Sequence, residues 1–145
     1  MYEDEINQKL KSVKNYLGSF AINEVENLKI NSYPSFMVVN LDERGNTGTH
    51  WISLAMYHND IFVCDSLGTL LPTNIFPAKL INFLYRISYH KTLHITRRLQ
   101  ELSSINCGKF CIYFIKNMSV HNNFENFLSS FSTDYKLNDL FINIT

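Results

Sequence analysis

The stretch HWISLAMYHNDIFVCDS, residues 50–66, decides the fold of this chain because it reads as two strands joined by a tight turn. Both halves are short runs rich in β-branched and aromatic residues, and His58-Asn59 separates them. A hairpin of this kind aligns antiparallel partners position by position, so position 50 is expected to pair with 66 or 67. The sequence therefore places the His50 side chain within reach of Asp65.

Hydrophobic spacing predicts further elements on both sides of this hairpin. Another strand is expected at 35–41, before the turn-like segment 43–48, and one more at 93–99. One helix is expected from Ile6 to Leu17 with Gly18 as the stop, and another at 78–90 after the breakers Pro72 and Pro77. A third is expected from Cys107 to about Ser119 with Asn106 as the N-cap. One or two more are expected at 123–143, with an apolar face formed by Phe124, Phe127, Leu128, Phe131, Leu137, Leu140 and Phe141. Together they indicate an α+β fold with a central sheet flanked by helices.

Composition indicates a single domain spanning 1–145. Of the 145 residues, 46% are hydrophobic and 14% are aromatic, which is enough apolar surface for a core. The 13 basic and 13 acidic side chains cancel, so no overall field draws the chain to nucleic acid or to an anionic membrane. Three cysteines, a polar acidic amino terminus and the lack of a long apolar run indicate a soluble protein of a reducing, intracellular compartment without a membrane partner.

The stretch SINCGKFC, residues 104–111, places a cysteine at the predicted start of a helix. Unpaired N–H groups and the positive end of the helix dipole favour a thiolate there, so Cys107 is a candidate nucleophile. Gly108 has no Cβ and leaves room for a substrate backbone beside the sulfur. Cys111 lies one turn later on the apolar face and is expected in the core. The alternative for Cys107 is a buried small apolar residue, because free cysteines are commonly buried.

A cysteine nucleophile needs a base and a group that orients the base. His50 at the start of one strand and Asp65 at the end of the next supply both if the hairpin forms. Gln100, seven residues before Cys107, has an amide that can donate to the oxyanion of a tetrahedral intermediate together with the Cys107 backbone N–H. Taken singly, His50 also fits a surface histidine, Asp65 a turn carboxylate and Gln100 a solvated polar residue.

This pattern resembles the adenain-like cysteine proteases, the adenovirus maturation endopeptidase and its relatives. The resemblance covers roughly residues 10–118 and is carried by His50-Trp51, Asp65-Ser66-x-Gly68, Gln100-x6-Cys107-Gly108, Tyr16-Leu17-Gly18-Ser19-Phe20 and Cys107-Gly108-Lys109-Phe110-Cys111. It implies a permuted papain-like fold with the nucleophile at a helix N-terminus. It further implies that Cys107 is the nucleophile, His50 the general base and then acid, Asp65 the orienter of His50, and Gln100 the oxyanion donor. Gly108 and Trp51 are expected to line the substrate cleft.

The resemblance implies a virus-encoded endopeptidase that cuts viral precursor proteins, often after Gly-Gly, during virion maturation in the host nucleus and the virion. The short chain, the Leu17-Gly18-x-Phe20 segment and the Gln100 to Cys107 spacing favour this viral branch over the SUMO-specific proteases, which share the order His, acid, Gln, Cys.

Two departures concern cofactors and partners. The adenoviral enzyme is basic and is activated by DNA and by a short viral peptide held through a disulfide, whereas this chain is neutral and has His94 where that cysteine is expected. We therefore expect a monomer without a disulfide-linked cofactor, and we leave open an activating peptide or DNA. Arg97, Arg98 and Lys109 form a local basic cluster that either touches nucleic acid or is a solvated strand end.

Other functions fit part of the pattern. A protease that removes SUMO or another ubiquitin-like modifier shares the chemistry, and a binding module on a dead protease scaffold shares the fold. Cys107 and Cys111 with His90 or His94 would supply metal ligands, but C-x3-C inside a helix without a second paired motif is a weak zinc signal, and no metal is expected.

Overall fold

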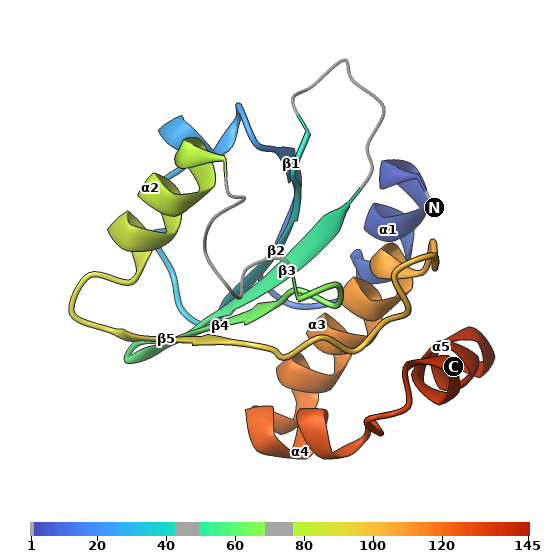
Figure 1. The fold of residues 1–145 in the computed structure, drawn as a ribbon. Helices are drawn as coiled ribbons and strands as arrows, with labels where there is room; N and C mark the ends of the chain where they lie inside the picture. Colours follow the sequence, from blue (N-terminus) through green and yellow to red (C-terminus); the bar gives the residue numbers. More distant parts are fainter. Residues whose placement is uncertain (1, 43–49, 69–76) are drawn as a thin grey trace.

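The computed structural model describes residues 2–42, 50–68 and 77–145. In the described part, a five-stranded mixed sheet separates two layers of helices (Figure 1). The strands lie in chain order as β1 (Tyr16–Ala21), β2 (Ser35–Asn40), β3 (Trp51–Met56), β4 (Asp60–Cys64) and β5 (Thr92–Ile95). β3 is antiparallel to both of its neighbours, and each edge strand is parallel to the strand beside it. The predicted hairpin is therefore confirmed as β3 and β4.

The helices cover both faces of this sheet. Helix α2 (Ala78–Ile87) and the short 3-10 helix η1 (Val25–Asn27) lie on one side, and α1 (Glu3–Leu10) and α3 (Cys107–His121) lie on the other (Figure 1). The last two helices, α4 (Phe124–Ser129) and α5 (Tyr135–Ile144), pack against α3. None of the helices in the described ranges is long and apolar enough to cross a membrane.

Alternation along the central strands divides the interior into two cores. In β3, Trp51 and Ala55 belong to the core under α3, whereas Ile52, Leu54 and Met56 belong to the core under α2. Every residue of β2 and β3 is buried, as expected for strands that are covered on both faces. A strand with two buried faces holds its register tightly, because a slip by one residue would exchange the two sets.

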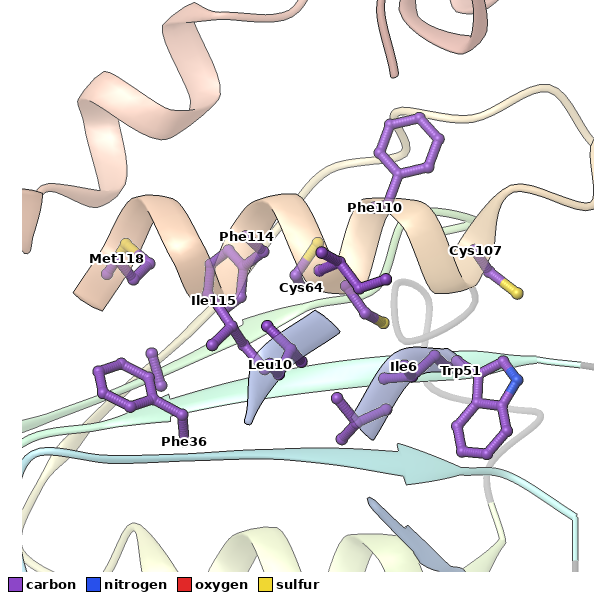
Figure 2. Packing of buried hydrophobic residues seen from close by; sticks show 14 of the residues in the cluster. Ile6, Leu10, Phe36, Trp51, Cys64, Cys107, Phe110, Phe114, Ile115 and Met118 are labelled. Atoms are coloured by element: carbon purple, nitrogen blue, oxygen red, sulfur yellow. The ribbon is translucent and has the colours of Figure 1, made fainter. Parts of the chain in front are cut away.

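Helix α3 is held between the sheet and the C-terminal helices. Phe110, Phe114, Ile115 and Met118 are all fully buried. Figure 2 shows Phe110 pointing away from the sheet, and its ring packs against that of Phe131 with centroids 5.7 Å apart. Cys111, at 1% exposure, lies in the core as predicted. This packing fixes the position of the first residue of α3.

The amino-terminal helix is shorter than its spacing predicts. It ends at Leu10, and the segment that contains Leu17 forms strand β1. Asn15 (φ 63°) turns the chain before the strand, and Gly18 (φ 120°) lies at an irregularity in the pairing of β1 with β2. Gly18 thus allows a bulge and does not stop a helix, because glycine adopts this conformation without steric cost.

The carboxyl-terminal prediction is right in its helices and wrong in part of its core. Leu137 and Leu140 are 54% and 59% exposed, whereas Asn138 and Ile142 are buried. The inner face of α5 makes polar contacts there, which spacing of apolar residues cannot reveal. The predicted strand at 93–99 is also shorter, because β5 ends at Ile95. The predicted turn at 43–48 and the breaker Pro72 lie outside the described residues.

Candidate active site

The two central strands and helix α3 bring the predicted site residues together. His50 directly precedes β3, Asp65 directly follows β4, and Cys107 is the first residue of α3. The ladder pairs Ser53 with Cys64, so its extension sets position 50 opposite position 67 and leaves Asp65 beside the histidine ring. In Figure 2, Cys107 lies at the end of α3 near Trp51.

His50 and Asp65 form a buried ion pair or hydrogen bond, depending on the protonation of the ring. His50 Nε2 lies 2.7 Å from Asp65 Oδ1, and the two side chains are only 8% and 0% exposed. Thr96 fixes the backbone of the carboxylate residue, since its Oγ1 accepts from the Asp65 N–H at 2.9 Å and donates to the Asp65 carbonyl at 3.2 Å. Thr96 therefore fixes the backbone that carries the acid, and the acid in turn orients the ring.

The second nitrogen of His50 is left for the thiol. Nδ1 is buried and has no hydrogen bond of ordinary length and angle in the structure. Because Nε2 is engaged by Asp65, Nδ1 is the ring nitrogen through which Cys107 interacts. Burial alone lowers the pKa of His50, but hydrogen bonding to Asp65, the interaction with Cys107 and the charges of these two groups raise it to about 9. Protonated His50 is thus stabilised at neutral pH.

Cys107 is set apart from the other two cysteines by its environment. Burial acts to raise the pKa of Cys107, but the interaction with His50, the Trp51 backbone N–H, the His50 charge and the Gly108 N–H together lower it below the usual thiol value. Cys64 and Cys111 are also buried and unpaired by disulfides, and burial raises the pKa of both. Cys107 is therefore the cysteine most readily converted to a thiolate, which is the nucleophilic form.

The start of α3 differs from the prediction in one detail. Asn106 occupies the N-cap position but makes no side-chain capping hydrogen bond. Its Nδ2 donates instead to Asp139 Oδ1 on α5, at 2.9 Å. The backbone N–H groups of the first helical turn are consequently not covered by the asparagine side chain, and the Gly108 N–H contributes to the lowered pKa of Cys107.

Gln100 is fully buried and is held at both ends of its amide. Ser66 Oγ donates to Gln100 Oε1 at 2.5 Å, and Gln100 Nε2 donates to the Ser104 carbonyl at 2.9 Å. The Ser66 carbonyl also accepts from the N–H groups of Leu99 and Gln100 at 2.8 and 3.0 Å. Among the described residues, none accepts the second N–H of the amide, and the oxyanion role of Gln100 stays a prediction.

Ser66 and Thr96 are functional candidates without an assigned role in the sequence prediction. Ser66 sits in the Asp65-Ser66-x-Gly68 pattern, and its place beside the acid was the one signal available. Thr96 lay inside the predicted strand 93–99, where a threonine is an ordinary strand residue. Both are at most 1% exposed, and each links the Asp65 turn to the segment that leads to Cys107.

Trp51 and Gly108, the two residues expected to line the cleft, adjoin the sulfur of Cys107. Both are buried, and the backbone N–H group of each lowers the pKa of Cys107. A role of these two residues in substrate binding stays a prediction.

The alternative set of metal ligands, Cys107 and Cys111 with His90 or His94, is not brought together in the described residues. In residues 2–42, 50–68 and 77–145, no group of three or more His, Cys, Asp and Glu side chains is placed to hold an ion. His94 lies on β5, where its Nε2 donates to Asp60 Oδ1 at 2.8 Å and its ring stacks on Phe62.

The basic residues near β5 make contacts within the chain. Arg97 donates to the carbonyls of Phe131 and Ser132, Arg98 Nε donates to the Gln100 carbonyl, and Lys109 Nζ donates to Asn143 Oδ1. The two arginines thus tie the segment before Cys107 to its surroundings.

Comparison with known proteins supports the fold. No family model matches the chain, and no curated protein matches its sequence. The ASFV pS273R protease has a similar structure, with a TM-score of 0.60 and 15% sequence identity over 94% of this chain and 62% of that protein. The central domain of the uncharacterized Lpg1148 protein from Legionella pneumophila superposes with a TM-score of 0.54 and 10% identity over 99% of this chain and 92% of that domain.

These comparisons confirm the predicted fold class. The chain has an α+β fold of the permuted papain-like type, with a mixed sheet between helical layers and Cys107 at a helix N-terminus. It spans 62% of the length of the viral protease that it matches. At 10% to 15% identity the likeness concerns the fold, and the chemistry has to be argued from the site.

Proposed function

We propose that this chain is a cysteine endopeptidase that acts through Cys107, His50 and Asp65. The observation that carries the proposal is the buried series Asp65, His50, Cys107, in which the carboxylate lies 2.7 Å from the ring and the ring interacts with the thiol. A pKa of about 9 for His50 and a lowered pKa for Cys107 favour an imidazolium and a thiolate at neutral pH. That pair is a nucleophile and an acid held side by side.

The reaction follows from the positions of these groups. The Cys107 thiolate attacks the carbonyl carbon of the scissile amide, and the oxyanion formed accepts from the Cys107 backbone N–H and from the Gln100 amide. His50 then gives its proton to the leaving amine, which departs as the thioester forms. Neutral His50 next takes a proton from water, whose oxygen attacks the thioester and releases Cys107.

The proposed substrates are viral precursor proteins with small residues, such as Gly-Gly, before the scissile bond. The likeness in fold to the ASFV pS273R protease and the sequence resemblance to the adenain-like proteases both support a viral substrate. Trp51 and Gly108 next to the sulfur support a narrow cleft. A protease for ubiquitin-like modifiers would use the same residues, and the assay below separates the two.

The test uses the purified chain, a fluorogenic peptide ending in Gly-Gly, and a peptide vinyl sulfone that ends in Gly-Gly. We expect cleavage of the peptide and labelling of Cys107, both lost in Cys107→Ala, with Cys64 and Cys111 unlabelled because they are buried and their pKa values are raised. Release of SUMO from a conjugate without peptide cleavage would reassign the activity to deconjugation. Labelling of Cys107 no faster than Cys64 would leave only a binding module.

A further inference from the structure

The segment between β5 and α3, residues 96–106, carries Gln100 and ends at the proposed nucleophile. It contains no helix or strand, so its position depends on contacts with other elements. Ser66 holds one side of it through the backbone and side chain of Gln100. The other side faces α5, a helix far away in the sequence.

Asp139 on α5 holds the second half of this segment with three hydrogen bonds. Its Oδ2 accepts from the Glu101 backbone N–H at 2.9 Å, and its Oδ1 accepts from Ser104 Oγ at 2.5 Å and from Asn106 Nδ2 at 2.9 Å. One carboxylate thus contacts the residue after Gln100 and the residue before Cys107. A charged acceptor makes each of these bonds stronger than a neutral one would.

The neighbouring Asn138 anchors the first half. Its Nδ2 donates to the Leu99 carbonyl at 2.9 Å, and its Oδ1 accepts from the Ser132 N–H at 2.8 Å. Asn138 is 2% exposed, and these hydrogen bonds explain why α5 turns a polar residue inward. The two consecutive residues of α5 therefore hold the chain on both sides of Gln100.

The contacts of Asp139 reach both donors of the proposed oxyanion site. Ser104, which donates to Asp139, also accepts from Gln100 Nε2 through its carbonyl, so the carboxylate acts on the amide through one intermediate residue. Asn106 is a residue type that readily caps a helix, and here its amide is drawn to Asp139. The N–H groups at the start of α3 are thereby kept for the sulfur and for a reacting carbonyl.

We propose that Asp139 is a positioning residue of the protease, which fixes residues 101–106 so that the Gln100 amide and the Cys107 N–H converge on one oxyanion. This inference rests on the proposed function. It assigns to α5 a part in the reaction without any contact with substrate. Formation of the Cys107 thiolate and the His50 imidazolium depends on His50 and Asp65 and not on Asp139.

The test compares Asp139→Asn with the wild type on the fluorogenic Gly-Gly peptide. Asparagine is nearly isosteric, but the NH2 group that replaces one carboxylate oxygen donates and cannot accept a hydrogen bond. Either Glu101 or the pair Ser104 and Asn106 therefore loses its acceptor. We expect kcat to fall roughly 10- to 100-fold with little change in KM, because the oxyanion contact exists only in the transition state.

Two measurements separate positioning from mere stability. Alkylation of Cys107 by iodoacetamide forms no oxyanion, so its rate and pH profile should stay those of the wild type in Asp139→Asn. Asp134→Ala is the matched control on α5, since Asp134 only caps the helix through the N–H groups of Lys136 and Leu137. It should lower Tm and leave kcat unchanged.

Ser104→Ala removes one of the same contacts from the other partner and needs no change in α5. As a single substitution it should lower kcat. In the double variant it should add little to the loss of kcat caused by Asp139→Asn, because both residues belong to one hydrogen-bond network. Wild-type kcat in Asp139→Asn, or an equal loss in Asp134→Ala, would overturn the inference while the proposed function stands. A wild-type protein that cleaves no peptide would overturn the proposed function and this inference with it.

Discussion

Removing Asp65 should convert the reactive thiolate of Cys107 into an ordinary thiol at neutral pH. The pKa of His50 is raised to about 9 from an ordinary value of 6.5, and the hydrogen bond to Asp65 is the largest of the causes that raise it. In Asp65→Ala, burial still lowers the pKa of His50 and the largest cause that raises it is gone, so this pKa should fall from about 9 toward its ordinary value of 6.5.

The magnitude follows from the two pKa values. At pH 7.5, a pKa of about 9 leaves roughly 97% of His50 protonated, whereas a pKa of 6.5 leaves roughly 9%. The imidazolium that stabilises the Cys107 thiolate is therefore depleted about tenfold by protonation alone. Loss of ring orientation adds to this, so the rate of thiol alkylation at pH 7.5 should fall by about tenfold or more.

The assay is alkylation by iodoacetamide over a range of pH, with the modified residue identified by mass spectrometry. The chain offers a matched control, because Asp60 also accepts from a histidine, His94, at 2.8 Å at the other end of β4. That pair is 41% and 34% exposed and lies away from Cys107, so Asp60→Ala should react like the wild type. An unchanged alkylation profile in Asp65→Ala would refute the assignment of Asp65 as the group that charges His50.

Three further predictions concern the same site and its support. In Cys107→Ala, the pKa of His50 should fall below about 9 because the thiolate no longer raises it, which an NMR titration of the ring will measure. In the same variant, the free energy of unfolding should decline as pH rises from 6.5 through the folded pKa of His50, by at most about 1.4 kcal/mol per pH unit, because a raised pKa stabilises the fold only while the group is protonated. In the wild type, the free energy of unfolding should change less with pH between about pH 6.5 and 8.5, because the proton that His50 gains on folding is offset by the one that Cys107 loses. If urea titrations give the same pH dependence for the wild type and Cys107→Ala, the ion pair is contradicted. Gly68→Ala should lower the free energy of unfolding by about 1–2 kcal/mol, because Gly68 has a φ of 66° and a Cβ would lie 2.9 Å from the Arg98 Cβ; an unchanged urea midpoint would contradict this packing.

The sequence predicted the part of the site that depends on local pattern. Strands β3 and β4 follow one another with a short turn, so their pairing and the approach of His50 to Asp65 follow from counting residues. The start of α3 at Cys107 was also predictable, because polar Asn106 precedes an apolar helical stripe. The function of Asn106 was not, because its side chain is drawn to a residue 33 positions later.

The parts that could not be predicted depend on contacts between distant segments. The spacing from Ile6 to Leu17 fits a helix, and only parallel pairing with β2 makes Tyr16–Ala21 a strand. Likewise, Asn138 and Asp139 read as solvated residues of a helix until the 99–106 segment lies against them. The apolar pattern of α5 predicted its existence but assigned Leu137 and Leu140 to the core, where they do not lie.

The register that places His50 beside Asp65 is enforced by the core and not by the site. A slip of β3 by one residue would move Ile52, Leu54 and Met56 from the core under α2 to the core under α3. It would also carry His50 away from Asp65, because the pairing of Ser53 with Cys64 sets both positions. Packing of Ile52, Leu54 and Met56 therefore resists a displacement that a single hydrogen bond of 2.7 Å could not. Since α3 packs on the same sheet, core substitutions in β3 or α3 should disturb the alignment of the triad before they unfold the chain.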